Sequence, residues 1–370
     1  MRVVSTWLAV AGLTACGSMT TLDDAGSAAG GNAGGLVATG GGSAGGAAGG
    51  GAVDAGAGLA NLCGYSYSGM NASASVNAIS TVTWSCTATT RAVVSNGLPD
   101  HEVGVFPNPN CPNTIRSYAV SATMPLAPVN TGTASSIATA GYAYNGVKFD
   151  PNTAGSCSAT ACTLVGNTGS WNIEAVGQSS FNFGVDSSNA HVQPSGEYHY
   201  HGMPEGAVSQ LGRGQAMTLV GYALDGFPVY ARYGYTNPTD ATSAVKVMKG
   251  SYRLKATPDT GRPSTTTYPL GAFRQDYEYA AGSGDLDECN GRTGVTPEFP
   301  QGTYHYYITD TYPFIQRCVK GTATGTMMGP TDGGMTMGPP ACMPGQTSMC
   351  CGDGTCNGPE THANCAADCP

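Results

Sequence analysis

The chain has 370 residues, a formal net charge of -9 and only 11% charged residues. It contains no cluster of lysines and arginines, which excludes nucleic acid and an anionic membrane surface as electrostatic partners. Glycine and tyrosine are abundant, whereas runs of leucine, glutamate or lysine are few, and this composition predicts β structure rather than helix.

The N-terminus has the pattern of an export signal. Arg2 precedes a short apolar run that ends in LTAC at residues 13–16, and this run is too short to span a bilayer. The small residues before Cys16 resemble the bacterial lipobox, in which cleavage leaves the cysteine as the lipidated first residue. An ordinary secretory signal is the alternative. Gly17 and Ser18 then imply, by the same resemblance, a lipoprotein of the outer membrane or cell surface.

Composition divides the rest of the chain into four parts. Residues 17–60 are rich in glycine and alanine, and residues 26–58 contain 15 glycines and no aromatic residue, which predicts a disordered linker. Residues 61–320 are long enough to bury a large core, and we expect a mainly β domain with a large antiparallel, sandwich-like sheet. Residues 321–341 form a Gly/Met/Pro linker, and residues 342–370 a small cysteine-rich module.

Two segments of the domain repeat the frame Pro-x-Gly-x-Tyr-His-Tyr. They read PSGEYHYH at residues 194–201 and PQGTYHYY at residues 300–307. In each copy a Pro/Gly turn leads into an aromatic run that predicts a strand. Because side chains alternate across a strand, His199 and His201 point to one face, and Tyr198 and Tyr200 to the other. His305 joins the histidine face if the two copies lie close together.

Three imidazoles on one surface are suited to a late transition metal, with copper or zinc favoured. The alternative is a half-buried strand, in which each imidazole bonds to a carbonyl and each tyrosine packs by its ring. The second copy carries Tyr307 where the first has His201. Any metal site built from these copies is therefore asymmetric.

Thirteen cysteines follow Cys16, and an oxidising compartment makes disulfides the expected state. Cys157 and Cys162 lie close enough to clip a small loop. Cys289 with Cys318, and Cys63 with Cys86, are further candidate pairs. Spacing does not fix the connectivity, and Cys111 has no obvious mate.

Six motifs give the domain a resemblance to the YHYH family of bacterial secreted proteins. They are the two copies above, NGLPDH at residues 96–101, AHVQP at 190–194, LDGFPVY at 224–230 and DLDECNG at 285–291. The resemblance covers most of residues 61–320 and supplies no reaction. Motif membership adds His101 as an expected fourth ligand beside His199, His201 and His305.

Other residues have weaker predicted roles. Glu197, Asp100 and Asp225 are candidates to contact the ligating imidazoles from behind and orient them. His191 is a further candidate for such a supporting position, although a lone histidine of this kind is more often structural. Oxygen side chains that are candidates for calcium are Asp285, Asp287 and Glu288 in the domain and Asp353 and Glu360 in the cysteine-rich module.

Two classes of function stay open at this point. The first is a surface-anchored lipoprotein that binds copper or zinc through its histidines. The second is a non-enzymatic module that binds a cell-surface polysaccharide or has a structural role, with structural histidines. No nucleophile elbow, phosphate loop or dinucleotide fingerprint follows a predicted strand, so the sequence assigns no reaction.

Overall fold

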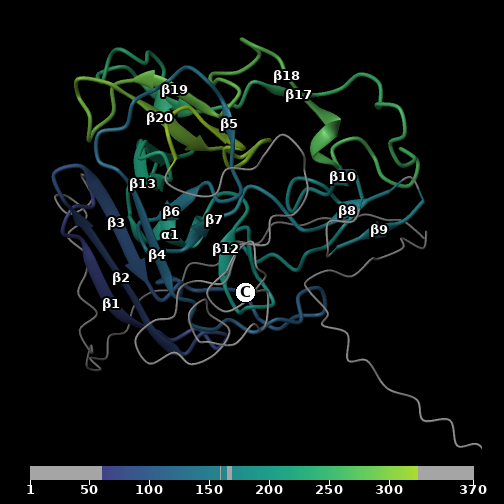
Figure 1. Ribbon diagram of the computed structural model, residues 1–370, viewed down its shortest axis with the longest axis horizontal. Coiled ribbons are helices and arrows are strands. Elements are labelled where there is room, and N and C mark those ends of the chain that lie inside the picture. The colour runs from purple at the N-terminus through teal and green to yellow at the C-terminus, as the bar shows by residue number, and fades with distance from the viewer. Residues whose placement is uncertain (1–60, 159, 165–168, 324–370) are drawn as a thin grey trace, which may run out of the picture.

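The computed structural model describes residues 61–158, 160–164 and 169–323 (Figure 1). In this part of the chain the strands form six sheets, and helix is limited to α1 (Glu205–Gln210) and the 3-10 turn η1 (Arg274–Asp276). The predicted mainly β fold is confirmed. Cys16, Asp353 and Glu360, and with them the predicted signal peptide, Gly/Ala linker and cysteine-rich module, lie outside the described residues.

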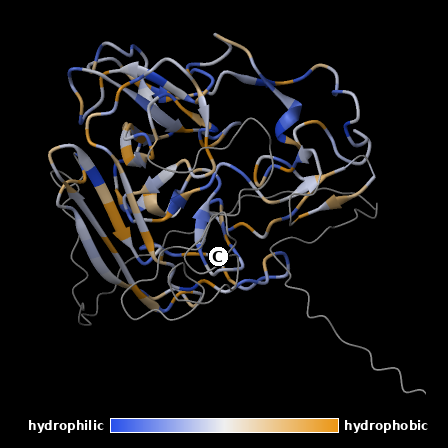
Figure 2. Ribbon diagram, viewed as in Figure 1, coloured by the Kyte–Doolittle hydropathy of each residue, from blue (hydrophilic) through white to orange (hydrophobic). Residues whose placement is uncertain are grey.

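An N-terminal sheet contains the first four strands in chain order, all antiparallel. They are β1 (Ser66–Asn71), β2 (Ala78–Cys86), β3 (Thr90–Ser95) and β4 (Val120–Pro125). Alternate residues of β2 are buried, with Val82 and Trp84 inside and Thr83 outside, as a sheet with one covered face requires. Figure 2 accordingly shows hydrophobic and hydrophilic residues mixed within this sheet.

A central sheet of eight strands forms the body of the domain, in the spatial order β11-β12-β7-β6-β13-β14-β20-β19. Its first four strands are β11 (Ala190–Val192), β12 (Tyr198–Tyr200), β7 (Lys148–Phe149) and β6 (Gly141–Ala143). The other four are β13 (Thr218–Ala223), β14 (Pro228–Ala231), β20 (Thr303–Ile308) and β19 (Gly291–Gly294).

The central sheet is mixed rather than purely antiparallel, which corrects the expected strand direction. β12 runs parallel to β7, and β20 runs parallel to β14. In both cases more than forty residues lie between the paired strands in the sequence, and a parallel pair needs such a long crossover. Short turns alone, as in a meander, would have made every pair antiparallel.

The two large sheets share one hydrophobic core. The Trp84 side chain crosses from the N-terminal sheet to the central sheet, where its indole N–H donates to the carbonyl of Tyr144 at 2.8 Å. Its ring lies 6.1 Å from that of Tyr222. This packing agrees with the sandwich-like arrangement expected from the sequence, and it covers the face of the central sheet near β6 and β13.

Smaller sheets extend the domain away from this core. They are β10 (Trp171–Asn172) with β8 (Ser156–Cys157) and β9 (Cys162–Thr163), β15 (Tyr233–Tyr235) with β16 (Val245–Val247), β17 (Tyr252–Leu254) with β18 (Tyr277–Tyr279), and β21 (Cys318–Val319) with β5 (Ser135–Ser136). A second, smaller hydrophobic cluster around Phe181 and Phe273 packs beneath β8 and β10. None of the helices in the described residues is long and apolar enough to cross a membrane.

Three disulfides confirm the pairings that the sequence suggested. They join Cys63 to Cys86, Cys157 to Cys162 and Cys289 to Cys318. Cys111 is disulfide-bonded as well, so it is not a free thiol. The cysteines of the described domain are therefore oxidised.

Candidate metal centre

Three histidines meet where β11 pairs with β12 at one edge of the central sheet. The two strands are antiparallel, and His191 lies directly opposite His199. His201 follows two residues later on the same face as His199, as strand alternation predicted. The Nε2 atom of His201 lies 3.0 Å from that of His199 and 3.1 Å from that of His191.

The opposite nitrogen of each imidazole contacts a backbone carbonyl. The Nδ1 atoms of His191, His199 and His201 lie 2.9, 3.2 and 2.9 Å from the carbonyl oxygens of Phe183, Glu197 and Asp150. A carbonyl oxygen only accepts hydrogen bonds, so each Nδ1 carries the proton and donates it. Each neutral ring then presents an Nε2 lone pair, and three lone pairs face one another with no hydrogen between them.

Protonation does not relieve this arrangement at neutral pH. The three side chains are buried, with at most 7% of any of them exposed. Burial lowers the pKa of all three imidazoles, and that of His201 falls to about 3. The positive charge that each ring would place beside the other two lowers the pKa of His199 further.

The geometry of this histidine triad fits a bound metal ion. Zinc bonds to imidazole nitrogen at about 2.0–2.1 Å in tetrahedral sites, which places neighbouring nitrogens roughly 3.3 Å apart. The two observed separations of 3.0 and 3.1 Å are close to that value. Side-chain ligand atoms of His191, His199 and His201 all lie within 4.8 Å of one another, the only such group among the described residues.

A buried ion-pair cluster lies beside the triad. The Lys148 ammonium, on the strand next to His199, is 3.1 Å from the Asp150 carboxylate and 3.0 Å from that of Glu197. Burial opposes the charge on Lys148, but the two carboxylates outweigh it and raise its pKa. With both carboxylates ionised, the cluster carries one net negative charge, which favours a cation nearby.

The YHYH protein family model matches residues 121–321, more than half of the chain. The chain belongs to the YHYH family. The matched segment contains both Tyr-His-Tyr copies and all three histidines of the triad. No curated protein and no solved structure matches the chain.

In this YHYH protein the predicted ligands His305 and His101 do not join His199 and His201. His305 is on β20, and four strands separate β20 from β12 in the central sheet. At about 4.8 Å per strand spacing, the two copies lie roughly 24 Å apart. The expectation that the copies share one site is therefore corrected.

His101 lies on the tyrosine face of β12 instead. Its Nε2 contacts the Tyr200 hydroxyl at 2.7 Å, and its Nδ1 contacts the Glu102 carbonyl at 2.7 Å. Both ring nitrogens have protein partners, which is the arrangement of a structural histidine. It is His191, expected to lie beside the ligands and not among them, that takes the third position.

His191 had a signal in the sequence. The turn at residues 193–197 connects two short strands, and a hairpin closed by this turn places His191 opposite His199. Reading the AHVQP motif and the YHYH motif as one hairpin, rather than as separate motifs, would have found the triad.

The three candidate carboxylates do not orient the imidazoles. Backbone carbonyls do so instead, and one of them belongs to Glu197. The Glu197 side chain contacts Lys148, while Asp100 accepts from the Asn145 amide at 2.7 Å. Asp225 lies in the other half of the sheet and accepts from the Tyr306 hydroxyl at 2.6 Å.

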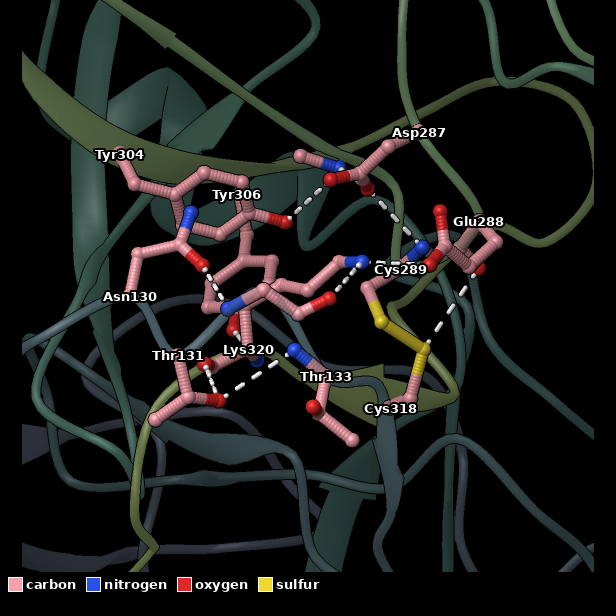
Figure 3. A network of polar contacts seen from close by, with 12 residues as sticks. Asn130, Thr131, Thr133, Asp287, Glu288, Cys289, Tyr304, Tyr306, Cys318 and Lys320 are labelled. Atoms are coloured by element: carbon pink, nitrogen blue, oxygen red, sulfur yellow. Dashed lines mark hydrogen bonds and ion pairs between the residues drawn. A yellow bond between two sulfur atoms is a disulfide. The ribbon is translucent and has the colours of Figure 1, made fainter.

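The candidate calcium ligands of the domain point to separate partners. Asp285 pairs with Lys246, Glu288 pairs with Lys320, and Asp287 accepts from the Tyr304 hydroxyl at 2.8 Å. Figure 3 shows the last two contacts beside the Cys289–Cys318 disulfide. The three carboxylates do not converge, so this acidic segment does not form the predicted calcium site.

The tyrosines of the two motifs are also part of the core. Side chains with 5% or less exposure are Tyr198, Tyr200, Tyr304, Tyr306 and Tyr307. A surface on which sugars stack needs exposed rings, so these five do not provide one. The predicted polysaccharide partner stays a prediction that would need other residues.

Proposed function

We propose that this YHYH protein binds one transition-metal ion through the Nε2 atoms of His191, His199 and His201. The observation that carries the proposal is the meeting of three unprotonated nitrogens in a buried site. Three acceptors without a donor repel one another, whereas a cation among them accepts all three lone pairs. The backbone carbonyls at Nδ1 hold the rings in the required tautomer before the ion arrives.

Copper and zinc are the ions that this donor set favours. Neutral imidazole is a ligand of intermediate softness, and both ions bind it readily. No fourth histidine, cysteine or carboxylate belongs to the group in the described part of the chain. Zinc would complete a tetrahedral site with water or a small ligand, and copper(I) would be satisfied with three nitrogens. The bound ion would tie β11 to β12 and supply a Lewis-acidic centre.

Metal analysis of the purified full chain tests this proposal. After loading with zinc or copper and removal of excess ion, we expect one equivalent per chain by mass spectrometry of the metal. The variant His199→Ala is expected to retain less than a tenth of an equivalent. His305→Ala, the same change at the corresponding position of the second copy, is expected to retain one. Equal binding by both variants, or no binding by the wild type, would refute the site.

We also propose that the protein is an exported lipoprotein anchored through Cys16. The LTAC sequence at residues 13–16 and the disulfides of the domain support this, since such bonds persist in oxidising compartments. In bacteria grown with labelled palmitate, the label is expected to be attached to the purified wild-type chain and not to the purified Cys16→Ser chain. Labelling that persists in the variant would contradict the assignment.

A further inference from the structure

The central sheet is composed of two halves with the same plan. Read from either edge inward, the order is an outer strand, the Tyr-His-Tyr strand, the second strand of a hairpin and its first strand. β11, β12, β7 and β6 form one half, and β19, β20, β14 and β13 the other. In both halves the outer pair is antiparallel and the next pair is parallel.

The two halves meet in a self-complementary seam between β6 and β13. Both strands contain Gly-Tyr-Ala, and Tyr142 pairs with Tyr222. Gly141 pairs with Ala223 and Ala143 with Gly221, which is the exchange of partners that a two-fold axis produces. A Cβ atom on either glycine would lie 2.2 or 2.1 Å from the carbonyl oxygen of the facing tyrosine. The seam thus requires glycine at both equivalent positions.

The hairpin turns of the two halves also correspond. They contain Asn145 and Gly146 in the first half, and Asp225 and Gly226 in the second. Both glycines have positive φ, +80° and +91°. The Asn145 amide donates to the Tyr200 hydroxyl at 3.1 Å, and Asp225 accepts from the hydroxyl of Tyr306, the equivalent tyrosine.

The outer strands keep the same register and the same anchors. His191 opposes His199 in the first half, and Arg292 opposes His305 in the second. Tyr198 donates to Asp186 at 2.7 Å, just as Tyr304 donates to Asp287 at 2.8 Å. Each aspartate precedes by four residues the first residue of its outer strand.

The backbone before each outer strand is also repeated. Asn189 and Asn290 have φ of 54° and 58°, values that few residues other than glycine adopt. Their carbonyls accept from the backbone N–H of His201 at 2.8 Å and of Tyr307 at 3.0 Å. The three positions of the histidine triad thus correspond to Arg292, His305 and Tyr307.

In the second half the histidine has the same orientation, but the lone pair on its Nε2 accepts a hydrogen bond. His305 Nδ1 donates to the Thr303 carbonyl at 3.0 Å, the same i–2 contact that His199 makes to Glu197. Its Nε2 lies 3.0 Å from the Tyr307 hydroxyl, which donates to it. That hydroxyl in turn accepts from Arg292 Nη2 at 3.3 Å. Each of these acceptors therefore receives a hydrogen bond.

We infer that the domain is a tandem structural repeat carrying two versions of one metal site, the second closed by substitution. Arg292 supplies the positive charge that an ion supplies in the first, and Tyr307 takes the place of the third imidazole. The scaffold of the site is retained in the backbone of β19 and β20. The double substitution Arg292→His/Tyr307→His therefore opens a second metal site.

Zinc stoichiometry in the full chain tests the inference, which rests on the proposed function only for the class of ligand. The wild type is expected to bind one equivalent and Arg292→His/Tyr307→His two. The control Arg292→Gln/Tyr307→Phe removes the same charge and hydroxyl without adding imidazoles, and is expected to bind one. Near-ultraviolet circular dichroism verifies that each variant is folded.

A triple variant separates failure of this inference from failure of the proposed function. Adding His199→Ala to Arg292→His/Tyr307→His disables the native triad and leaves only the rebuilt site, which is expected to bind one equivalent. That result supports the inference even if the wild type binds nothing. A folded triple variant without zinc overturns the inference, whatever the wild type binds. If Arg292→His/Tyr307→His does not fold, the variant Arg292→Gln/Tyr307→His, which removes the guanidinium charge and leaves two imidazoles, should bind zinc more weakly at the second site. A folded variant of this kind without zinc at the second site overturns the inference as well.

Discussion

Chelation of the metal-loaded full chain is expected to lower its midpoint of thermal unfolding by roughly 10 °C. An ion that binds only the folded state at a thousand times its dissociation constant stabilises that state by about 4 kcal/mol. For a domain of this size, each kcal/mol changes the midpoint by about 2–4 °C. Differential scanning calorimetry before and after treatment with a chelator measures the change.

The dependence of the unfolding midpoint on pH gives a second test of the buried triad. Burial lowers the pKa of His201 to about 3, so the folded metal-free domain keeps this ring neutral while the unfolded chain takes up a proton below about pH 6.5. The unfolded state then binds more protons, and stability falls as the pH decreases from about 6.5 towards 3. Each such histidine contributes a slope of about 1.4 kcal/mol per pH unit. His191 and His199, whose pKa values are also lowered, act in the same direction.

His199→Ala is the control for both the chelation and the pH measurements. Without a complete triad the variant is expected to have the same midpoint with and without chelator. Its dependence on pH is also expected to be shallower, because one buried imidazole is gone. A chelator effect of equal size in this variant would place the stabilising ion somewhere other than at the triad.

Lys148→Met is expected to destabilise the domain by about 3–5 kcal/mol, the second large effect. The ammonium lies between the Asp150 and Glu197 carboxylates, and all three side chains are at least 86% buried. Methionine fills a similar volume but leaves two carboxylates in a buried site without their cation. Chemical denaturation monitored by fluorescence measures the loss.

Two further variants identify the cause of that loss. Lys148→Met/Glu197→Gln removes one of the two buried carboxylate charges left without a cation and is expected to recover part of the stability. Arg253→Met breaks the exposed pair with Glu278 and is expected to cost less than about 1 kcal/mol, because solvent screens such pairs. If Lys148→Met costs no more than Arg253→Met, the buried cluster does not stabilise the fold.

Much of this protein followed from local rules applied to the sequence. Alternation on a strand placed His199 and His201 on one face and Tyr198 and Tyr200 on the other, because successive side chains of a strand must point in opposite directions. An Asp-Gly pair between apolar runs is typical of a hairpin turn, and Asp225 and Gly226 occupy that turn between β13 and β14. These features depend on neighbours in the chain, so the sequence contains all that is needed to predict them.

The predicted calcium ligands and the carboxylates predicted to orient the imidazoles show where the local density of a residue type misleads. Asp285, Asp287 and Glu288 are close in sequence, but each carboxylate contacts a partner from a different element. Asp225 belongs to LDGFPVY, one of the six motifs of the domain. Its carboxylate nevertheless contacts Tyr306 in the second half of the central sheet, away from the triad. Which partner a side chain reaches depends on contacts between distant residues.

The sequence by itself determined a mainly β fold, the identity of the two histidine strands, and candidate disulfide pairs that the structure confirmed. Only the tertiary structure decided which histidine completes the triad. Strand order set the distance between the two Tyr-His-Tyr copies, since four strands intervene between β12 and β20. Pairing across the β11–β12 hairpin set His191 against His199. Strand order and pairing arise from long-range contacts, so motif spacing along the chain does not specify them.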